Sequence, residues 1–593
     1  MKLSALLEAA LLCCFPVYLN AATFVVDTTS DATLSACTAT PGDCSLRGAV
    51  AATNSLAGAD TIQFNIPNCP AGLCTITWTT TAGLAITDQV TIDGYTQPGA
   101  MPNTNTPAQG GLNGILRIEL DGAGQNTTGI GVTSSTGPSV IRGLVINRFN
   151  FRSGIFLDTV AAHRIEGCYI GTDPTGTIAR PNNEFGILVN NRAGAYVIGG
   201  LTPDTRNLIS GNGFDGMHFQ LGSQALPSNG MKVQGNLFGT TASGTDLLLS
   251  NRFQLALAIG PGGAQDISIG GSDPNARNVF AGSSTSPMLL FDQNGDAVGP
   301  SFAGTVVQGN LFGTNALGTA ALGSAVARNI LVGTNARGLT IGGTVAGAAN
   351  RLGSGGEGIA LGGRANILGN SIDNHAGLGI TFGEPTRVPN DAGDPDTAAG
   401  NNRQNFPEIS AYNGSNQVTY RVDSAPANSV YPIRVEFFRA SEDEGLQLLG
   451  SDSYLLAEAQ TSKLVVLTTP AAASDVIVAT AIDANGNSSE FSFQTASLAI
   501  ATPEGSPCTT SDSVLCNGFE SGPQASLVAR ITATATSGPF APNGVVNVSD
   551  NRGASCQLTL QPTGTPLTSQ GACILANSGA AGAITVTAVL DTF

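Results

Sequence analysis

The sequence predicts an all-β protein built around a parallel β-helix, a rod in which the chain winds in stacked coils. The first observation is a long repeat, because Ile-Gly-Gly recurs at Ile198, Ile269 and Ile341, with first glycines 71 and 72 residues apart (270 minus 199, 342 minus 270). The second is that each repeat holds short runs of Val, Ile and Leu, separated by Gly and Asn, without helical spacing. The third is a charged fraction of 11%, against roughly 25% in an average globular protein.

Each repeat unit is expected to hold two coils. Two strand-like runs of the same form, Gly186-Ile-Leu-Val and Gly216-Met-His-Phe, lie within one unit. A period of this length is therefore two turns of a solenoid, whose coils stack to bury one continuous core.

Asparagines at matched positions of successive coils are expected to stack as a ladder. Asn236, Asn310 and Asn370 occupy such positions, where side-chain amides can pair with the neighbouring turns. Cys168 holds the same position in an earlier repeat, so it is expected to be a small buried turn residue rather than a nucleophile.

Residues 1–22 have the pattern of a secretory signal. Lys2 precedes an apolar run that ends at Leu19, and Ala21 and Ala22 offer small residues for cleavage, although Glu8 interrupts the run. The run is too short to span a membrane as a stable helix, and no later stretch is long and apolar enough. We therefore expect a secreted or cell-surface protein without a transmembrane segment in the mature chain.

The cysteines support export, because eight of them form four close pairs that suit an oxidising compartment. The expected disulfides are Cys37 with Cys44, Cys69 with Cys74, Cys508 with Cys516, and Cys556 with Cys573. The pairs are too scattered for a zinc site, which needs four ligands at compatible spacing.

Residues 23–110 are expected to form an N-terminal cap and the first coils, because the open end of a solenoid needs covering. A short helix is expected with Ser45 as N-cap and with Leu46, Ala49 and Val50 along one face.

The cap carries a motif that resembles a known family. Cys44-Ser-Leu-Arg, followed by Asn54 and Asp60-Thr-Ile, resembles the CSLREA motif of secreted bacterial right-handed β-helix proteins in the pectate-lyase-like superfamily. The resemblance continues through Asp93-Gly-Tyr-Thr-Gln-Pro-Gly-Ala and the Gly-Asn-Leu-Phe-Gly-Thr repeats, and covers roughly residues 24 to 400. It implies a right-handed solenoid but no known reaction. Gly48 stands where the motif has Glu, so a capping salt bridge through that acid is absent.

The chain is expected to divide into further parts after the cap. Residues 111–383 form the β-helix repeats, 384–407 an acidic linker loop, and 408–496 an antiparallel β-sandwich that resembles immunoglobulin-like modules. Residues 497–525 form a linker that holds one disulfide, and 526–593 a second small β module that could end within its final strand.

The charge excludes several partners. The net charge is −17, and lysine occurs only at Lys2, Lys232 and Lys463, so no basic stripe can neutralise phosphates. Nucleic acid is therefore not expected as a partner, and an anionic sugar polymer would meet an acidic protein. Trp78 is the only tryptophan, so a flat platform for sugar rings is not obvious from the sequence.

No catalytic residue can be assigned from the sequence. His218 is the best single candidate for acid–base work, because it lies between Met217 and Phe219 on a strand and should point outward, while His375 sits in a turn. The sequence shows no partner for either histidine that would shift its pKa. The acids of the repeats are expected to form turns rather than a catalytic dyad, because sister coils often carry Asn, Ser or Gly there. They are Asp173, Glu184, Asp204, Asp215, Asp246, Asp266, Asp273 and Asp292.

The acidic linker is the candidate metal site. Asp391, Asp394 and Asp396 place hard oxygen ligands at alternating positions, and Asn401 and Asn402 follow, as in calcium loops. The competing interpretation is a solvated acidic turn, because Asp, Gly and Pro together are ordinary turn formers. Calcium is the only cofactor that the sequence suggests.

These observations favour a secreted or surface-displayed protein with a binding or structural role, adhesin-like, with an extracellular glycan as the candidate partner. The alternative is an extracellular polysaccharide lyase or glycoside hydrolase acting in a groove of the β-helix, which rests on the fold alone. The absence of a recognisable catalytic set leans away from an enzyme.

Overall fold

We describe a computed structural model of the chain. It describes residues 21–134, 136–220, 228–248, 252–259, 264–292, 301–324, 327–396, 401–472 and 475–493, and beyond them the strands 497–501, 507–509, 514–516, 527–534, 544–550, 555–562, 568–575 and 584–590. Residues 1–20 of the expected signal segment lie outside the described part of the chain.

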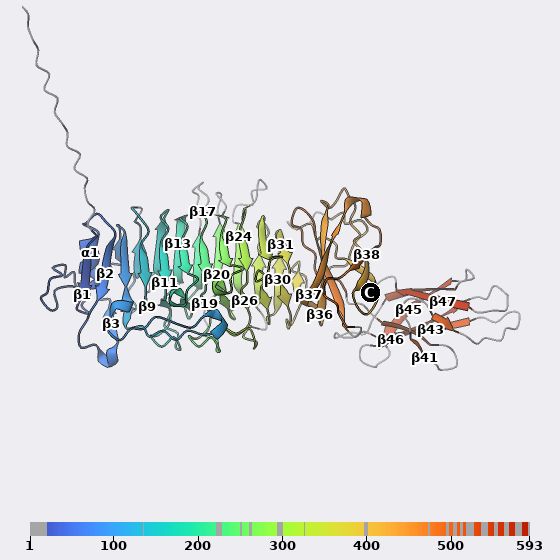
Figure 1. Cartoon of the computed structure of the whole chain (residues 1–593), viewed down its shortest axis with the longest axis horizontal. Helices are drawn as coiled ribbons and strands as arrows, with labels where there is room; N and C mark the ends of the chain where they lie inside the picture. The colour runs from blue at the N-terminus through green and yellow to red at the C-terminus, as the bar shows by residue number, and fades with distance from the viewer. Residues whose placement is uncertain are drawn as a thin grey trace, which may run out of the picture.

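The predicted parallel β-helix is confirmed, and it is built from three long parallel sheets (Figure 1). After β1, which starts sheet 1 alone, each coil adds one strand to sheet 1, then one to sheet 2 and one to sheet 3. The eleven strands of sheet 1 are β1 (Thr23–Val26), β2 (Asp60–Phe64), β5 (Val90–Asp93), β8 (Val140–Arg142), β11 (Arg164–Glu166), β14 (Val197–Gly199), β18 (Lys232–Gln234), β22 (Ser268–Gly270), β25 (Val306–Gln308), β28 (Leu339–Gly342) and β31 (Ala365–Leu368).

Sheets 2 and 3 contain ten strands each. Sheet 2 comprises β3 (Cys74–Thr77), β6 (Ile118–Asp121), β9 (Leu144–Asn147), β12 (Tyr169–Ile170), β15 (Leu208–Ile209), β19 (Leu237–Phe238), β23 (Val279–Phe280), β26 (Leu311–Phe312), β29 (Arg351–Leu352) and β32 (Ser371–Ile372). Sheet 3 comprises β4 (Leu84–Ile86), β7 (Ile130–Val132), β10 (Ser153–Thr159), β13 (Phe185–Ala193), β16 (Asp215–Gln220), β20 (Phe253–Ile259), β24 (Ser286–Asp292), β27 (Arg328–Val332), β30 (Glu357–Leu361) and β33 (Ile380–Thr381). A two-stranded parallel pair, β17 (Ser228–Asn229) and β21 (Ala264–Gln265), lies outside these sheets.

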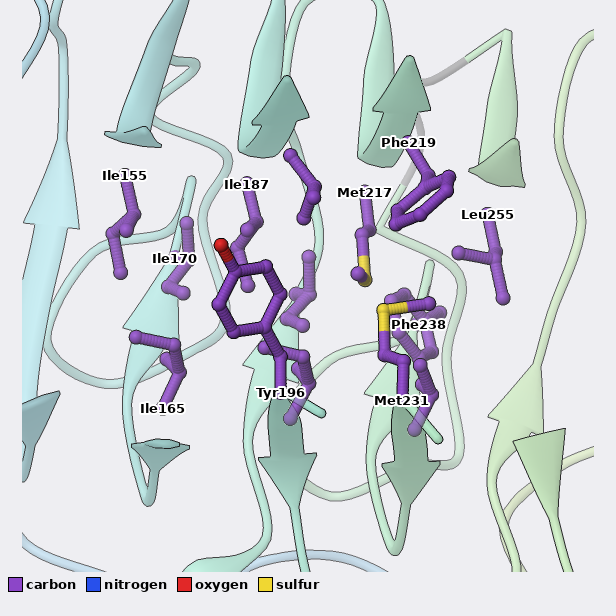
Figure 2. Close-up of a cluster of buried hydrophobic side chains, with 14 of the residues drawn as sticks. Ile155, Ile165, Ile170, Ile187, Tyr196, Met217, Phe219, Met231, Phe238 and Leu255 are labelled. Atoms are coloured by element: carbon purple, nitrogen blue, oxygen red, sulfur yellow. The ribbon is translucent and has the colours of Figure 1, made fainter. Parts of the chain in front are cut away.

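The core fills the space between the three sheets with one layer of apolar side chains per coil. Figure 2 shows Ile187 and Met217 of sheet 3 facing Tyr196 and Met231, which precede strands of sheet 1. On sheet 2 the inward residues of three consecutive coils are phenylalanines whose rings stack at 4.9 and 5.0 Å between centroids: Phe238, Phe280 and Phe312. Matched side chains on successive coils thus form columns, because parallel strands in register place equal positions above one another.

The asparagine ladder is confirmed and is longer than the sequence predicted. Between the three expected members lie Asn278 and Asn350, and Asn207 precedes them; all six side chains are buried. Each Nδ2 donates to Oδ1 of the next asparagine at 2.8 to 3.1 Å. Cys168 is buried at the start of the ladder, as expected, and its N–H donates to Asn207 Oδ1 at 2.8 Å. Burial raises the pKa of the Cys168 thiol to about 12.

The predicted cap helix is α1 (Leu46–Thr53), and Ser45 accepts a hydrogen bond from the N–H of Gly48. A Cβ atom on Gly48 would lie 1.8 Å from the carbonyl oxygen of Leu34, which explains why no larger residue fits there. Asn54, after the helix, pairs with the edge of β4, where Nδ2 donates to Ala85 O at 2.8 Å and Oδ1 accepts from Thr87 N at 2.9 Å. Side chains of the cap therefore satisfy the free edge of the first coil.

The single-turn 3₁₀ helices lie in loops: η1 (Pro70–Gly72), η2 (Gly94–Thr96), η3 (Pro107–Gln109), η4 (Pro203–Thr205), η5 (Pro274–Ala276) and η6 (Leu456–Glu458). Among the described residues, no helix is both long and apolar enough to cross a membrane.

A long excursion between β5 and β6, which we call the strap (residues 97–117), runs along the outer face of sheet 2 (Figure 1). Its Leu112 and Leu116 pack on outward side chains of successive strands, among them Val145, Leu208 and Leu237. The N–H of Leu112 donates to Ala242 O at 2.6 Å. The sequence did not predict this element.

Two antiparallel three-stranded sheets pack together after the solenoid. One contains β34 (Glu408–Tyr412), β35 (Gln417–Arg421) and β38 (Lys463–Val466), and the other β37 (Glu444–Tyr454), β36 (Ile433–Ser441) and β39 (Ile477–Ile482). The remaining strands form one eight-stranded sheet in the order β41 (Pro507–Thr509), β40 (Ser497–Ala501), β43 (Leu527–Thr534), β46 (Thr568–Leu575), β45 (Ser555–Pro562), β44 (Gly544–Asp550), β47 (Ile584–Leu590) and β42 (Val514–Cys516).

The sandwich 408–493 covers the last coil of the solenoid. Phe438, Val478 and Phe491 belong to the same apolar core as the coils. Two of its carboxylates accept hydrogen bonds from backbone N–H groups of that end: Glu436 from Gly369 at 2.7 Å, and Glu490 from Phe382 at 3.2 Å and Val388 at 2.7 Å. These carboxylates satisfy N–H groups at the end of the solenoid.

This junction predicts that stability falls as pH rises. Burial raises the pKa of Glu490 from 4.5 to about 7 and that of Asp394 from 3.8 to about 6. Because the folded state holds these protons more tightly than the unfolded chain, the resulting stability is full below the ordinary pKa values and is lost as pH rises toward 7. For Glu490 the loss is on the order of 3 kcal/mol.

Calorimetric melting between pH about 5 and pH about 8 measures this slope. We expect Glu490→Gln to flatten it and Glu408→Gln, an exposed change on the same sandwich, to leave it unchanged. Equal slopes for Glu490→Gln and the parent protein would contradict the assignment.

Three of the four expected disulfides are present: Cys37–Cys44, Cys69–Cys74 and Cys556–Cys573. The side chains of Cys508 and Cys516 lie outside the described residues.

Candidate functional site

His218 points outward from sheet 3, as expected, because its neighbours Met217 and Phe219 point into the core (Figure 2). The structure supplies the partner that the sequence did not reveal. His218 Nδ1 lies 2.7 Å from Oδ2 of Asp215, which is fully buried and whose Oδ1 accepts the N–H of Phe253 at 3.1 Å. Since a carboxylate only accepts, Nδ1–H donates and Nε2 remains as the acceptor.

Aromatic rings surround this pair on the neighbouring coils. The His218 ring stacks on Phe185 with centroids 4.6 Å apart, and Phe185 meets Phe214 edge to face at 5.9 Å. Phe214 is 37% exposed, so its ring is open to solvent. Phe185, Asp215 and Phe253 occupy matched positions at the starts of β13, β16 and β20, and Phe214 immediately precedes β16.

Arg252 completes the cluster at the start of β20. Its Cζ lies 4.0 Å from the centroid of Phe214 and 4.5 Å from that of Phe253, and its Nε lies 3.9 Å from Asp215 Oδ1. We call Phe185, Phe214, Asp215, His218, Arg252 and Phe253 the His218 patch. Phe214 and Arg252 are its exposed members, while Phe185 and Phe253 are buried beneath them. One exposed ring beside hydrogen-bonding groups is a combination with which proteins hold amphipathic ligands such as sugars.

Asp215 departs from the expectation that the acids of the repeats only form turns. The expectation holds for Asp173, which accepts the N–H groups of Thr177 and Ile178 at 2.9 Å, and for Asp273, whose carboxylate caps η5. Asp215 instead orients a histidine. Residues three apart on a regular strand face opposite sides, but Asp215 is the first residue of β16, where the chain leaves a turn.

His375 is buried at the junction with the sandwich. Its Nδ1 lies 2.9 Å from Glu444 Oε1 and its Nε2 lies 3.0 Å from Asn329 Oδ1. Both ring nitrogens are therefore engaged, and the side chain has no exposed surface. This histidine holds the sandwich against the last coils.

The predicted calcium ligands lie beside the sandwich. Asp394 is buried, and its Oδ2 accepts hydrogen bonds from Gln404, Ser424 and Ser429 at 2.6 to 2.9 Å. Burial raises the pKa of Asp396, and the charge of Asp391 raises it further. Within the described part of the chain, no three His, Cys, Asp or Glu side chains come together as a metal-binding group. Calcium binding therefore stays a prediction.

If the site binds calcium, a chelator should lower the melting temperature and added calcium should restore it. Calcium at a hundredfold excess over Kd should raise the free energy of unfolding by about 2.7 kcal/mol. Asp391→Asn should remove this response, whereas Asp423→Asn on the sandwich should keep it. A melting temperature that EGTA does not change would contradict calcium binding at this site.

Comparisons with known proteins add no function. A scan against protein-family models finds no match to the chain, and a search of curated proteins finds none either. The argument for function therefore rests on the geometry of the His218 patch.

Proposed function

We propose that the protein is an exported, surface-exposed β-helix that binds extracellular glycans on the outer face of sheet 3. The supporting observation is the His218 patch, in which the rings of Phe185, Phe214 and Phe253 lie beside Asp215, His218 and Arg252 across three adjacent strands. Sugar rings present apolar faces and hydroxyl edges, which such a surface can contact together.

Export is supported by the signal-like N-terminus and the paired cysteines. The resemblance of residues 44–64 to the CSLREA motif points the same way and implies a right-handed solenoid, and the strand pattern after it resembles an immunoglobulin-like sandwich. The solenoid would act as a rigid rod that presents the patch, because stacked coils with a continuous core do not bend freely.

The test is a glycan array on the purified mature chain, followed by calorimetric titration of the best ligand. We expect Phe214→Ala to weaken binding about tenfold, since a stacked ring contributes about 1.4 kcal/mol. Phe151→Ala is the matched control, because that ring is 47% exposed but lies outside the patch. Equal losses for both variants, or no glycan bound at all, would contradict the proposal.

A second candidate, an extracellular polysaccharide lyase, is favoured by the bond between His218 and Asp215. In that reaction the free Nε2 would take the proton from the carbon beside a sugar carboxylate. The electron pair left behind forms a C=C bond as the glycosidic C–O bond breaks, and the departing sugar oxygen takes a proton from water. Glycoside hydrolysis usually needs two carboxylates, and Asp215 is buried and already engaged.

Release of unsaturated sugar ends tests this candidate. His218→Ala and Asp215→Asn should both abolish it, while Phe151→Ala should not. Turnover that survives His218→Ala would remove the histidine from any reaction.

A further inference from the structure

Arg252 differs from the ion-paired arginines on the solenoid surface in how its guanidinium is used. Arg142 and Arg328 lie 2.5 and 2.6 Å from carboxylate oxygens, in direct ion pairs. Arg252 lies 3.9 Å from Asp215, too far for a direct hydrogen bond, and its Nε has no hydrogen-bond partner among the described residues.

The neighbouring acid does not take up the unused donors, because its closest oxygen lies 3.9 Å from Nε. One oxygen of Asp215 receives the imidazole of His218 at 2.7 Å and the other receives the N–H of Phe253 at 3.1 Å. Asp215 is also completely buried, whereas the Arg252 side chain is 42% exposed. The carboxylate is thus buried beneath the guanidinium; because Nε is itself buried, the two Nη groups are the donors that a group arriving from solvent can reach.

Two phenyl rings hold the guanidinium in place. Its Cζ lies within 4.5 Å of the ring centroids of both Phe214 and Phe253. A guanidinium packed against aromatic rings loses little further freedom on binding, and its donors match the two oxygens of a carboxylate or a sulfate.

We propose that Arg252 makes the His218 patch a site for acidic saccharides, in which a carboxylate or a sulfate of the sugar pairs with the guanidinium. This proposal rests on the glycan binding proposed above and specifies its ligand class. The net charge of −17 acts at long range and is screened within about 8 Å at physiological salt, whereas the contact with Arg252 is local.

The experiment uses an array that carries the same oligosaccharide backbones in three forms: with uronate, with sulfate, and unsubstituted. Titrations follow with the parent protein, Arg252→Gln and Arg252→Lys. The matched control is Arg152→Gln, which removes an exposed arginine three coils earlier on the same edge of sheet 3.

We expect the parent protein to prefer one or both acidic forms. Arg252→Gln should weaken acidic binding by about 10-fold to 100-fold, a larger loss than it causes with the neutral backbone. Arg252→Lys, which keeps the charge but loses the planar fork, should recover part of the loss. Arg152→Gln should bind as the parent does. Comparing the affinities for the uronate and sulfate forms shows which anion the site prefers.

Equal binding of neutral and acidic forms, with no selective loss in Arg252→Gln, would overturn the ligand class while glycan binding stands. No binding to any backbone would overturn both proposals. Melting curves of each variant show whether a loss comes from unfolding, and recovery by Arg252→Lys cannot come from a misfolded patch.

Discussion

Replacing Asn278 by alanine is expected to lower the free energy of unfolding by about 4 kcal/mol, because it breaks the asparagine ladder at its centre. Its Nδ2 donates to Val233 O at 2.7 Å and to Asn310 Oδ1 at 2.9 Å, and its Oδ1 accepts both the backbone N–H and the Nδ2 of Asn236 at 3.0 Å.

The cost falls on groups that keep no other partner. The side chain of Asn236 still donates to Ile198 O, and Asn310 Oδ1 still accepts the backbone N–H of Asn278. The N–H of Asn236 loses its acceptor inside the core, where an unsatisfied group costs about 1 to 3 kcal/mol, whereas the carbonyl of Val233 stays in the ladder between β18 and β22 and loses one donor.

Chemical denaturation of Asn278→Ala and the parent protein measures the difference. Asn183→Ala is the matched control, because Asn183 is an exposed asparagine at a turn of the same solenoid, and we expect it to change stability by less than about 0.5 kcal/mol. Similar values for the two variants would show that the ladder is incidental to stability.

The ladder also shows why the sequence predicted the fold so well. Stacked coils place equal positions above one another, so the physical requirement for Asn, Gly and apolar residues recurs in the sequence at the period of the coils. Asn236 and Asn310 belong to alternate coils of this series, and Asn207, Asn278 and Asn350 recur at the same period (278 minus 207 is 71, 350 minus 278 is 72). The period alone does not show that the two sets alternate in one ladder.

The strap and the His218 patch were not predictable in the same way. The strap occurs once, so nothing repeats, and its contact with Ala242 joins residues 130 positions apart (242 minus 112). The pairing of His218 with Asp215 depends on how the chain enters β16 from its turn. The aromatic rings of Phe185 and Phe214 lie on different coils and meet only when those coils stack.

The sandwich shows a related limit. Its alternating strands predicted a separate β module, but Phe438 and Phe491 belong to the core of the solenoid. An apolar side chain on a strand shows that one face is buried, and the sequence does not show what buries it.

Replacing Arg206 by methionine is expected to release the strap and to lower the free energy of unfolding by about 3 kcal/mol. This side chain is 1% exposed and donates to three carbonyl oxygens: Nε to Gly235 at 2.9 Å, Nη1 to Asn105 at 2.8 Å and Nη2 to Gly110 at 3.0 Å. Burial lowers the pKa of Arg206 to about 10, because the buried guanidinium loses its hydration. Its hydrogen bonds to the three carbonyl oxygens offset that loss. Methionine fills similar volume but leaves those oxygens without a donor.

Hydrogen exchange locates the effect. The N–H of Leu112, which bonds to Ala242 O, should exchange at least about tenfold faster in Arg206→Met, while the N–H of Asn278 in the ladder should stay protected. Arg277→Met is the matched control, because Arg277 occupies the same position one repeat later and makes one hydrogen bond, from Nε to Gly309 O at 3.3 Å. If both arginines proved equally replaceable, the strap would be held by its leucines against sheet 2 and not by the buried cation.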